Sequence, residues 1–480
     1  MRGTWLFAFV PIVVFIVCCV ALFAHYKAFD MLGLAAGGVI ALLIGALFAK
    51  DYQGFWDAVM RGIASPTSVA IIVILFVIGI FSELIKVTGL SDGFVWIGGE
   101  LGLSGSSIAV FTFIAVGLMA MATGSSIGTM FTAFPIFFPA GVALGADPAL
   151  LAGAIISGGI LGDNVAPISD TTIISASTQR FRHREGAADI AGVVSSRARY
   201  ALAAAAISVV GFLVLGFVAG DGSSSSTLAG AGSAKPLIML VPVALLMVTA
   251  FVTRDIFKAI TVGLITGTAT ALAFGLIGTR DVVSVTDGAL TGYIAAGMHG
   301  IIGTVALVIT VFGIMGVLNA AGVLDRVVEG LLASRFVHTP RGAEASIGLG
   351  ITATTVMFGG VNSASMMTFG PVADEIGSRV GLHPYRRCNV MDCFAMGVSC
   401  VVPFVSAFLF IGALLTSGYD TIEPQSALDL FPAVLYPLAL TVVMIVAVLT
   451  GWGRTYEGAD GQPVRDQAQA LIPAPATHLA

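Results

Sequence analysis

The chain has 480 residues, of which 57% are hydrophobic and only 10% are charged, and its formal net charge is −5. Soluble globular proteins carry about 25% charged residues, so the composition excludes that class and favours a polytopic membrane protein. The five cysteines fall in apolar segments without metal-ligand spacing, which argues against a disulfide framework or a zinc site. The expected environment is the lipid bilayer, and no nucleic-acid partner is expected.

Apolar runs of about 20 residues predict a series of transmembrane helices, because a helix of that length crosses the hydrocarbon layer. The predicted spans are 5–24, 30–49, 66–87, 149–179, 200–219, 236–253, 259–278, 299–320, 388–416 and 430–450. The first run resembles a signal peptide, but we interpret it as a retained helix because it has a counterpart later in the chain.

Two further apolar regions, 104–144 and 344–378, are each long enough for a helix-turn-helix. Length alone leaves open whether they are re-entrant hairpins or pairs of full spans. Their polar, glycine-rich tips at 124–129 and 359–365 favour re-entrant hairpins, although small residues at the tips also fit ordinary close helix packing.

The segment GDNVAPISDTT at 162–172 places two acids, an amide and several hydroxyls inside an apolar span. An ionisable group at bilayer depth costs roughly 2.5–3.5 kcal/mol, so Asp163 and Asp170 need a compensating role. Pro167 interrupts the helical hydrogen bonds between them, and unwound backbone is tolerated in a membrane only where it lines a protected cavity. Carboxylates and free carbonyls at this depth predict a site for a small cation. The alternative is a purely structural pair of acids.

The second predicted broken span, 388–416, contains Asp392, followed by Ser399 and Pro403. Asp392 is open to two interpretations, a proton-carrying acid or an acid that anchors its helix. Glu83 and Lys86 fit a surface ion pair at the end of a span. Arg386 and Arg387 are interpreted as topology anchors.

The two halves of the chain match each other. At an offset of about 230, Lys50, Asp51 and Gly62 correspond to Arg280, Asp281 and Gly292, and at an offset of 236 Pro135, Pro148 and Pro167 correspond to Pro371, Pro384 and Pro403. Such an ordered series indicates internal duplication. The predicted domains are a first repeat at 1–220, a Gly/Ser-rich linker at 221–235, a second repeat at 236–451 and a disordered cytoplasmic tail at 452–480.

The positive-inside rule orients the repeats. No Lys or Arg occurs between Val87 and Gln179, so those loops are predicted to be external. The matching part of the second repeat carries Arg326, Arg335, Arg341, Arg379, Arg386 and Arg387, and the first broken span is followed by Arg180, Arg182, Arg184, Arg197 and Arg199. Both sets predict cytoplasmic loops. The N- and C-termini are also predicted to be cytoplasmic. The repeats are therefore inverted, and inverted repeats with broken helices are typical of secondary transporters that bind substrate near the midplane.

The motif at 162–172 resembles the Gly-Asp-x-x-x-Pro-x-Ser-Asp-Thr-Thr signature of the NhaC-type Na⁺/H⁺ antiporter family, within the ion transporter superfamily, and TGSSIGT at 123–129 is similar to a second stretch of that family. The resemblance implies an all-α polytopic membrane protein of two inverted repeats, with about ten transmembrane helices, two re-entrant hairpins and two discontinuous helices. It also implies a transport domain that moves against a scaffold.

The resemblance further implies that hairpin tips and unwound loops bind Na⁺. The candidate ion- and substrate-binding residues are Ser125, Ser126, Thr129, Asp163, Asn164, Ser169, Asp170 and Thr171, and, from the second half, Asn362, Ser363, Ser365, Asp392 and Ser399. Asp163 and Asn362 are taken as Na⁺ ligands. The acids of the first motif become serines in the second half, so two equal ion sites are not expected.

The expected function is therefore a secondary active transporter rather than an enzyme, a Na⁺/H⁺ antiporter that works by elevator-like alternating access. H⁺ and Na⁺ would compete for the midplane carboxylates, because desolvation and a neighbouring carboxylate both favour the protonated form. Asp163 is the expected competing group and Asp170 its partner, and no cofactor beyond the coupling ions is expected.

An alternative stays open, a Na⁺- or H⁺-coupled carrier of an amino acid or monocarboxylate held at helix N-termini by Asn362, Ser363 and Ser365. No Lys or Arg is predicted in a central break, which argues against a dianion. The expected location is the bacterial inner (plasma) membrane. Superfamily relatives often form homodimers through the scaffold, so a homodimer is an open expectation.

Overall fold

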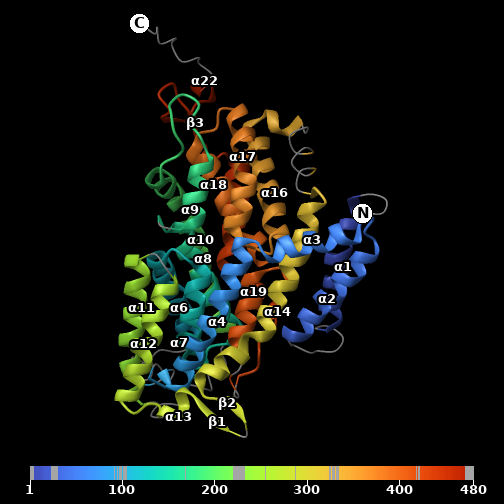
Figure 1. Cartoon of the computed structure of the whole chain (residues 1–480). Helices are drawn as coiled ribbons and strands as arrows, with labels where there is room; N and C mark the ends of the chain where they lie inside the picture. Colours follow the sequence, from blue (N-terminus) through green and yellow to red (C-terminus); the bar gives the residue numbers. More distant parts are fainter. Residues whose placement is uncertain are drawn as a thin grey trace.

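The computed structural model is mostly helical, with two short strand pairs at its edges (Figure 1). It describes residues 5–22, 31–90, 92–93, 96, 100, 105–167, 169–219, 233–253, 256–286, 288–323, 326, 330, 335–417, 419 and 422–470. Most of the predicted linker at 221–235 lies outside the described residues. The helical class predicted from the sequence is confirmed.

The first predicted repeat folds as a run of helices. The early ones are η1 (Trp5–Phe9), α1 (Val10–Val20), α2 (Met31–Leu47), α3 (Tyr52–Ile63) and α4 (Pro66–Val87). They are followed by α6 (Gly105–Thr123), α7 (Ser126–Ala143), α8 (Pro148–Val165), α9 (Asp170–Thr178) and α10 (Ile190–Ala219). Side-chain caps fix several starts: Asp147 accepts from the Leu150 amide at 2.8 Å, directly before Pro148 opens α8.

The second predicted repeat is also mostly helical. It begins with η3 (Lys235–Met239), α11 (Leu240–Thr253), α12 (Ile256–Ala273), α13 (Thr279–Val282), the antiparallel strands β1 (Ser284–Thr286) and β2 (Ala289–Thr291), and α14 (Tyr293–Ala320). It continues with η4 (Arg335–His338), α16 (Pro340–Met357), α17 (Asn362–Arg379), α18 (Pro384–Ala395), η5 (Val398–Val401), α19 (Ala407–Thr416), α20 (Ala427–Ala433) and α21 (Leu435–Thr450). The chain then forms the antiparallel strands β3 (Tyr456–Glu457) and β4 (Pro463–Val464), and α22 (Gln467–Ala470).

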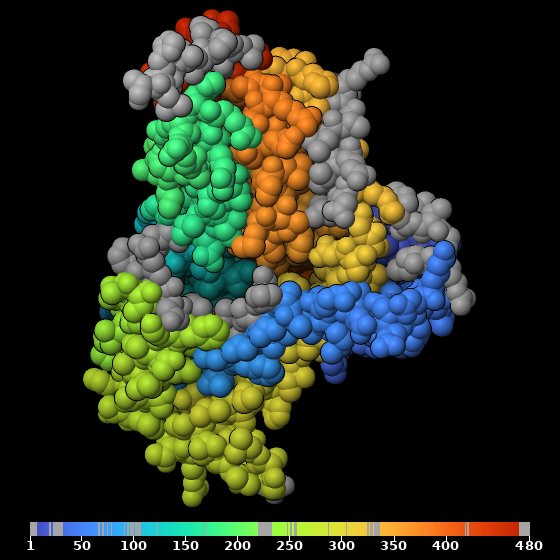
Figure 2. Space-filling view, turned by 45° about the horizontal axis from the view of Figure 1, so that its top comes forward, coloured from blue at the N-terminus to red at the C-terminus, as the bar shows by residue number. Residues whose placement is uncertain are grey.

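The helices pack in two groups. In the first, α14 packs against α2, α3 and α4, and α12 packs against both α11 and α4. We call α1–α4 and α11–α14 the scaffold group. In the second, α8 packs against α6, α7, α10 and α20, while α16, α17 and α18 pack on one another; we call α6–α10 and α16–α21 the hairpin group. Figure 1 shows α9, α16, α17 and α18 at the upper end and α11 and α12 at the lower end. Figure 2 shows the green and orange segments of the hairpin group standing over the blue and yellow-green scaffold segments.

Glycine allows the closest helix contacts in both groups. A Cβ atom at Gly162 would lie 2.2 Å from the Gly117 carbonyl oxygen, where α8 crosses α6, and one at Gly316 would lie 2.2 Å from the Ala58 carbonyl oxygen, where α14 crosses α3. A side chain cannot fit at either distance. Small residues let apolar helices approach in this way when no aqueous hydrophobic force drives them together, which accounts for part of the high glycine content.

Both predicted hairpins form a helix-turn-helix. The first is α6 and α7, which turn at Gly124 (φ 67°), and the second is α16 and α17, which turn at Gly359 (φ 65°) and Gly360 (φ 82°). These left-handed conformations favour glycine, which explains the glycine-rich tips. How deeply either hairpin enters a membrane stays a prediction.

Both predicted broken spans are interrupted. Between α8 and α9 the chain unwinds around Pro167, which lacks an amide hydrogen and cannot continue the helical hydrogen bonds. Between α18 and α19 it passes through η5 and through Phe404, whose φ of 67° lies in the left-handed region. Such a conformation is strained for a bulky residue and ends regular structure there.

Membrane-spanning capacity varies among the described helices. Four of them, α7, α8, α10 and α14, are long and apolar enough to cross a bilayer, and α20 with α21, bent by 52°, could form a fifth span. Shorter apolar helices occupy parts of the other predicted spans, including Leu32–Leu47 and Phe257–Ala273. The full set of about ten spans therefore stays a prediction.

The C-terminal tail corrects a prediction. Up to residue 470 it is folded: the Glu457 carboxylate accepts from the backbone amides of Arg182 at 2.6 Å and His183 at 2.7 Å, and the Glu457 amide donates to the Gly381 carbonyl. The expectation of a disordered segment is wrong for this part, because its polar composition concealed a β-hairpin that satisfies its backbone groups on the neighbouring loops.

Two arginines interpreted from the sequence as topology anchors are buried in ion pairs, and their topological role stays a prediction. Arg386 and Arg387 are at most 1% exposed; they pair with Glu344 at 2.8 Å and with Asp374 at 3.3 Å. Glu83 and Lys86 do form the partly exposed pair that the sequence predicts, at 3.6 Å.

Candidate functional site

Asp163 lies in the last turn of α8, directly before the break, and its side chain is buried. Its Oδ2 atom accepts from the Ser126 amide at 3.2 Å and from the Ser126 hydroxyl at 2.7 Å, and its Oδ1 atom accepts from the Ser169 hydroxyl at 2.5 Å. Ser126 opens α7 at the first hairpin tip, and Ser169 precedes α9. One carboxylate thus joins the hairpin tip to both sides of the broken helix.

The local sequence explains this approach. Gly159 lies one turn before Asp163 on the same face of α8, and a Cβ atom there would meet the Ser126 carbonyl oxygen at 3.2 Å. A residue without a side chain therefore lets the hairpin tip reach the carboxylate. Ser169 occupies the N-cap position of α9, but its hydroxyl makes no capping bond and instead donates to Asp163.

The other predicted residues of the first half lie around this carboxylate. Thr171 shares a hydrogen bond with the Ser169 hydroxyl at 2.8 Å. Ser125 caps α7 by accepting from the Gly128 amide at 3.1 Å, and the Thr129 hydroxyl donates to the Ser125 carbonyl at 2.7 Å. Ser125 and Thr129 therefore stabilise the hairpin turn, whereas Ser126 and Ser169 contact the acid.

Asp170 is not part of this contact network. It is the first residue of α9 and its side chain is exposed. Among the described residues the structure records no hydrogen bond between Asp170 and Asp163. A carboxylate in the first turn of a helix is stabilised by the free amides there, so Asp170 suits the start of α9 better than the expected role as partner of Asp163.

The two broken helices meet through Asn164 and Asp392. The Asn164 amide donates to Asp392 Oδ1 at 2.8 Å, and the Tyr436 hydroxyl donates to Asn164 Oδ1 at 2.9 Å. Asn164 and Asp392 are 0% exposed. Two candidates that are 228 residues apart in the sequence are therefore in direct contact. Their hydrogen-bond network does not include the Asp163 carboxylate, which has its own contacts with Ser126 and Ser169.

Arg197 completes this network and was missed at the sequence level, where it counted as a loop residue. It lies in α10 with a fully buried side chain, its Nη2 atom is 2.9 Å from Asp392 Oδ2, and its Nη1 atom donates to the Asn164 carbonyl at 2.8 Å. Of the two interpretations of Asp392, this pairing favours the anchoring one. The available signal was an arginine inside an apolar helix, which needs a buried acid as partner.

The described part of the chain buries five acids, and their partners differ. Glu344 pairs with Arg386 and Arg454, Asp374 pairs with Arg182 and Arg387, and Asp392 pairs with Arg197. Glu457, in the tail, accepts from two backbone amides. Asp163 is held by two hydroxyls and one amide and has no basic partner. Four of these five acids lie in helices, and Asp163 is the one of those four that has no positively charged side chain beside it.

The second hairpin tip packs on the second break. Asn362 opens α17 and is buried; with its amide nitrogen as donor it bonds to the carbonyls of Ala395 at 3.0 Å and Gly360 at 3.2 Å. The Ser365 hydroxyl contacts the Thr355 hydroxyl at 2.9 Å, and the Ser399 hydroxyl donates to the Phe394 carbonyl at 2.6 Å. Ser363 is partly buried. No hydrogen bond between the described residues brings Asn362 to Asp163.

Residues 1–217 match the sequence profile of the Na⁺/H⁺ antiporter family. The resemblance to this family is therefore confirmed for residues 1–217. The matched part contains Asp163, Ser126 and Ser169, whereas Asn362, Asp392 and Ser399 lie beyond it.

Two curated relatives are similar to shorter stretches. The malate-2H⁺/Na⁺-lactate antiporter of Bacillus subtilis is 29% identical over 189 residues, which is 39% of this chain and 38% of that protein. The Na⁺/H⁺ antiporter NhaC of Alkalihalophilus pseudofirmus is 32% identical over 136 residues, 28% of this chain and 29% of that protein. The chain thus covers well under half the length of either relative. The crystal structure of the Alcanivorax borkumensis YdaH transporter aligns with 92% of this chain and 99% of its own, at 13% identity and a TM-score of 0.36.

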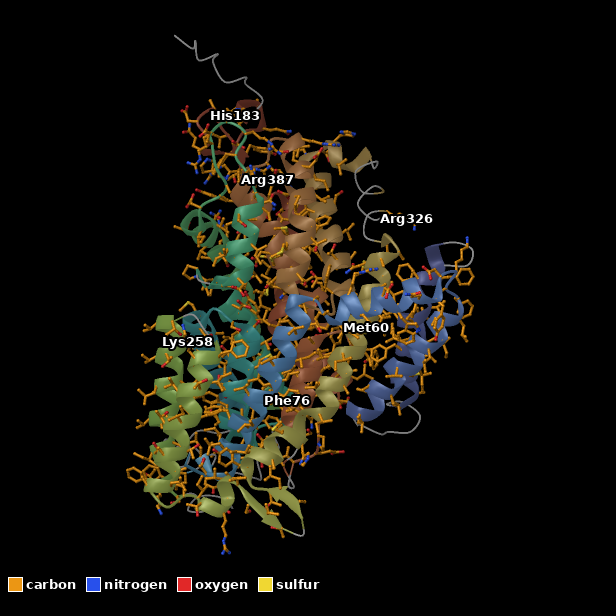
Figure 3. The ribbon with its side chains drawn as sticks, in the orientation of Figure 1. Met60, Phe76, His183, Lys258, Arg326 and Arg387 are labelled. Atoms are coloured by element: carbon orange, nitrogen blue, oxygen red, sulfur yellow. The ribbon has the colours of Figure 1, made fainter. Side chains whose placement is uncertain are left out.

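A second cluster of ionisable groups lies where the tail folds over the start of α18. Figure 3 shows His183 and Arg387 at this end of the molecule. His383 is buried here, its Nδ1 atom accepts from the Tyr385 amide at 3.2 Å, and its Nε2 atom contacts the Gly461 carbonyl at 3.1 Å. These partners fit the neutral ring, with hydrogen on Nε2 only. The pKa of His383 is lowered from 6.5 to about 4, chiefly by burial; nearby Arg387 and Arg184 contribute to the lowering, and the hydrogen bond to the Gly461 carbonyl opposes it.

This geometry predicts acid sensitivity of the folded tail. Because the unfolded chain binds a proton at His383 near pH 6.5 and the folded chain only near pH 4, stability should fall as the pH drops through that window. The loss is roughly 3 kcal/mol at most. Thermal unfolding of the purified protein at pH 7.5 and pH 4.5 should show a larger drop for the wild type than for His383→Gln. Equal drops would contradict the assignment.

Proposed function

We propose that this protein is a secondary active transporter that exchanges Na⁺ for H⁺, with Asp163 as the group for which the two ions compete. One observation carries the proposal: Asp163 is buried among apolar helices, and none of the described residues places a positive charge beside it. A buried carboxylate without a counter-charge is costly, so it needs a proton or a cation to neutralise it. Occupancy by one ion at a time, combined with access from alternating sides, is sufficient for antiport.

The surroundings of Asp163 suit a small hard cation. Na⁺ prefers oxygen ligands, and the two carboxylate oxygens lie next to the hydroxyls of Ser126 and Ser169. The Thr171 hydroxyl and the unwound carbonyls around Pro167 are near enough in the chain to add ligands. In the structure the two serines donate to the carboxylate; rotation of each hydroxyl would turn an oxygen lone pair toward a bound ion.

The arrangement of the helices supports an elevator-like mechanism. We propose that the hairpin group is the transport domain and moves against the scaffold group, and that the two halves form an inverted repeat. The support is that each hairpin tip packs on a helix break of its own half: Ser126 on Asp163, and Gly360 beside Cys400, where a Cβ atom would lie 2.8 Å from the carbonyl oxygen. The ion site would then move together with the hairpins as one unit.

The test uses the full chain in proteoliposomes that contain a pH-sensitive dye. A pulse of NaCl to one side should change the lumenal pH in the direction of exchange, with no organic solute present. Choline chloride is the matched control for ionic strength. A response that required an organic solute in addition to Na⁺ would contradict simple cation exchange and support a solute carrier, which is the activity that the name of the Bacillus subtilis relative describes.

A further inference from the structure

The loop between α9 and α10 is held through its backbone by two acids of the second half. The Arg180 amide donates to Asp374 Oδ1 at 2.8 Å, and Asp374 lies in α17, the second helix of the second hairpin. The amides of Arg182 and His183 both donate to Oε1 of Glu457, at 2.6 Å and 2.7 Å. Both acids are buried, and hydrogen bonds from amides to buried carboxylates are among the stronger ones in proteins.

A basic side chain binds the same loop from α18. Arg387 donates through Nη2 to the Arg180 carbonyl at 2.6 Å and through Nη1 to the Asp374 carbonyl at 3.1 Å. The amide and the carbonyl of Arg180 are thus bound by side chains 194 and 207 residues away. We call the three side chains of Asp374, Arg387 and Glu457 the clasp. It joins the end of the first broken helix to the second half of the chain.

The folded tail presents Glu457 to this loop. The Glu457 amide donates to the Gly381 carbonyl at 2.9 Å, and the His383 amide donates to the Thr455 carbonyl at 3.0 Å. Gly381 and His383 lie in the loop between α17 and α18. The tail therefore adds a short extended segment to that loop, and this segment fixes the position of the Glu457 carboxylate.

A second attachment binds the tail to α16. Arg454 donates to both oxygens of Glu344, at 2.9 Å and 2.7 Å, and to the Val448 carbonyl in the last turn of α21 at 2.7 Å. Glu344 is fully buried near the start of α16. These partners, like those of Glu457, lie in the hairpin group or in the loops between its helices. The tail should therefore move together with the hairpin group.

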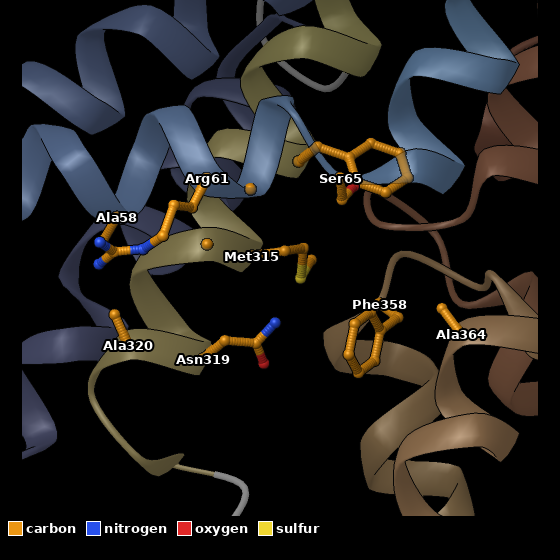
Figure 4. Close-up of a pocket in the computed structure, with 11 residues that line it drawn as sticks. Ala58, Arg61, Ser65, Met315, Asn319, Ala320, Phe358 and Ala364 are labelled. Atoms are coloured by element: carbon orange, nitrogen blue, oxygen red, sulfur yellow. The ribbon is translucent and has the colours of Figure 1, made fainter.

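The turn of the second hairpin lies at the opposite end of α16 and α17, and it faces the scaffold group across a cavity of about 250 Å³. Figure 4 shows Phe358 of the turn on one wall, opposite Met315 and Asn319 of α14. The second hairpin is thus bound by charged groups to its own helix group, whereas its turn is separated from the scaffold group by open space. The clasp stiffens the hairpin group itself.

The clasp fixes one end of α9, and the ion site lies at the other end. This helix has nine residues and is roughly 13 Å long. Its middle is held by Arg197, which donates to the Thr172 hydroxyl at 2.9 Å. A short rod that is held near one point can still pivot, so a second attachment is needed to fix its direction. Ser169, which donates to Asp163, directly precedes the helix and would shift if α9 tilted.

We propose that Glu457 is a positioning residue for the Asp163 site. By closing the clasp it fixes the far end of α9 and, through α9, the distance between Ser169 and Asp163. This inference rests on the proposed function, because it takes Asp163 and Ser169 as the residues beside the ion. Glu457 acts through an acceptor oxygen that binds two backbone amides, so a glutamine, which keeps such an oxygen, should replace it in large part.

The first measurement is hydrogen–deuterium exchange of the full chain in nanodiscs, which requires no transport. In Glu457→Ala the amides of residues 170–183 should exchange at least about tenfold faster than in wild type, because α9 and its loop lose an attachment. Glu457→Gln should restore most of the protection. Glu185→Ala removes an exposed acid from the same loop and is the matched control, with protection equal to wild type.

The second measurement is the Na⁺ dependence of proton movement in proteoliposomes. Glu457→Ala should raise the half-saturating Na⁺ concentration about threefold, because a displaced Ser169 weakens ion binding while Asp163 is still present. The maximal rate should stay close to wild type, and Glu457→Gln should restore the half-saturating concentration. A lower maximal rate at unchanged half-saturation would indicate a general structural defect and would contradict a positioning role.

A disulfide tests whether the clasp stays closed during transport. Leu382 and Tyr456 are opposite each other in an antiparallel bridge, between two backbone hydrogen bonds, where Cα atoms are about 4.5 Å apart and a disulfide can form. Oxidised Leu382→Cys/Tyr456→Cys should exchange Na⁺ for H⁺ as fast as the same protein after reduction. If oxidation blocks exchange and reduction restores it, the tail is a lid that must open, and the proposal is overturned.

Two results of the first measurement would also overturn the proposal: unchanged protection of residues 170–183 in Glu457→Ala, or an equal loss of protection in Glu457→Gln and Glu457→Ala. The two proposals fail separately. If NaCl moves no protons in wild type, the proposed function fails, whereas hydrogen–deuterium exchange still decides whether Glu457 fixes α9.

Discussion

Asp163→Asn should abolish Na⁺-dependent proton movement in proteoliposomes, down to the level of empty liposomes. The amide keeps the shape of the carboxylate and can still accept from Ser126, so the helix break should stay folded. It can neither carry the proton nor neutralise a cation, so neither ion can occupy the site productively. The measurement is the lumenal pH change after a NaCl pulse, at equal amounts of inserted protein.

Matched variants separate this role from general effects of charge. Asp57→Asn removes an exposed carboxylate on α3 and should leave exchange unchanged. Ser126→Ala and Ser169→Ala each remove one oxygen next to the acid and should raise the half-saturating Na⁺ concentration about tenfold. Full exchange in Asp163→Asn, with loss in Asp170→Asn instead, would show that the competing acid is Asp170.

Thermal unfolding gives a second readout of the same variant. A ligand that binds only the folded state stabilises it in proportion to the logarithm of its concentration. NaCl at high pH should therefore raise the melting temperature of the wild type more than choline chloride does, and this difference should vanish in Asp163→Asn. Equal shifts in both proteins would mean that Na⁺ acts elsewhere or through ionic strength alone.

The sequence predicted the parts of the site that depend on local chemistry. Pro167 in an apolar run is enough to predict a break, and the glycine-rich tips predict turns that need left-handed residues such as Gly124 and Gly360. The burial of Asp163 follows from the same segment, since the residues that precede it in α8 are apolar or small. Each of these features is decided within a few residues along the chain.

What depends on long-range contact was not predictable. Asp163 and Asp170 are seven residues apart and would share one face of a continuous helix, but the break between them separates their environments, and only Asp163 is buried. Arg197 was assigned to a loop because the positive-inside rule counts charges near span ends without knowing their partners. Its partner Asp392 lies 195 residues away, and no local sequence pattern predicts that ion pair.

Arg197→Gln should destabilise the protein by about 3–5 kcal/mol, the usual cost of leaving one member of a buried ion pair unpaired. The reason is that Asp392 is fully buried and Arg197 is its only basic partner among the described residues. Asn164 and Ser175 would still donate to the carboxylate, but neutral donors do not replace the lost charge. Denaturant unfolding of the purified protein in nanodiscs measures the loss.

The double variant Arg197→Gln with Asp392→Asn decides what the pair is for. With both charges removed, no buried charge is left uncompensated, so most of the lost stability should return and the double-mutant cycle should show strong coupling. If the double variant also exchanges Na⁺ for H⁺, Asp392 anchors the junction of the two broken helices and carries no transported proton. A stable double variant without exchange would instead assign Asp392 a direct part in proton transfer. A double variant that is no more stable than Arg197→Gln would show that the ion pair is not the source of the lost stability.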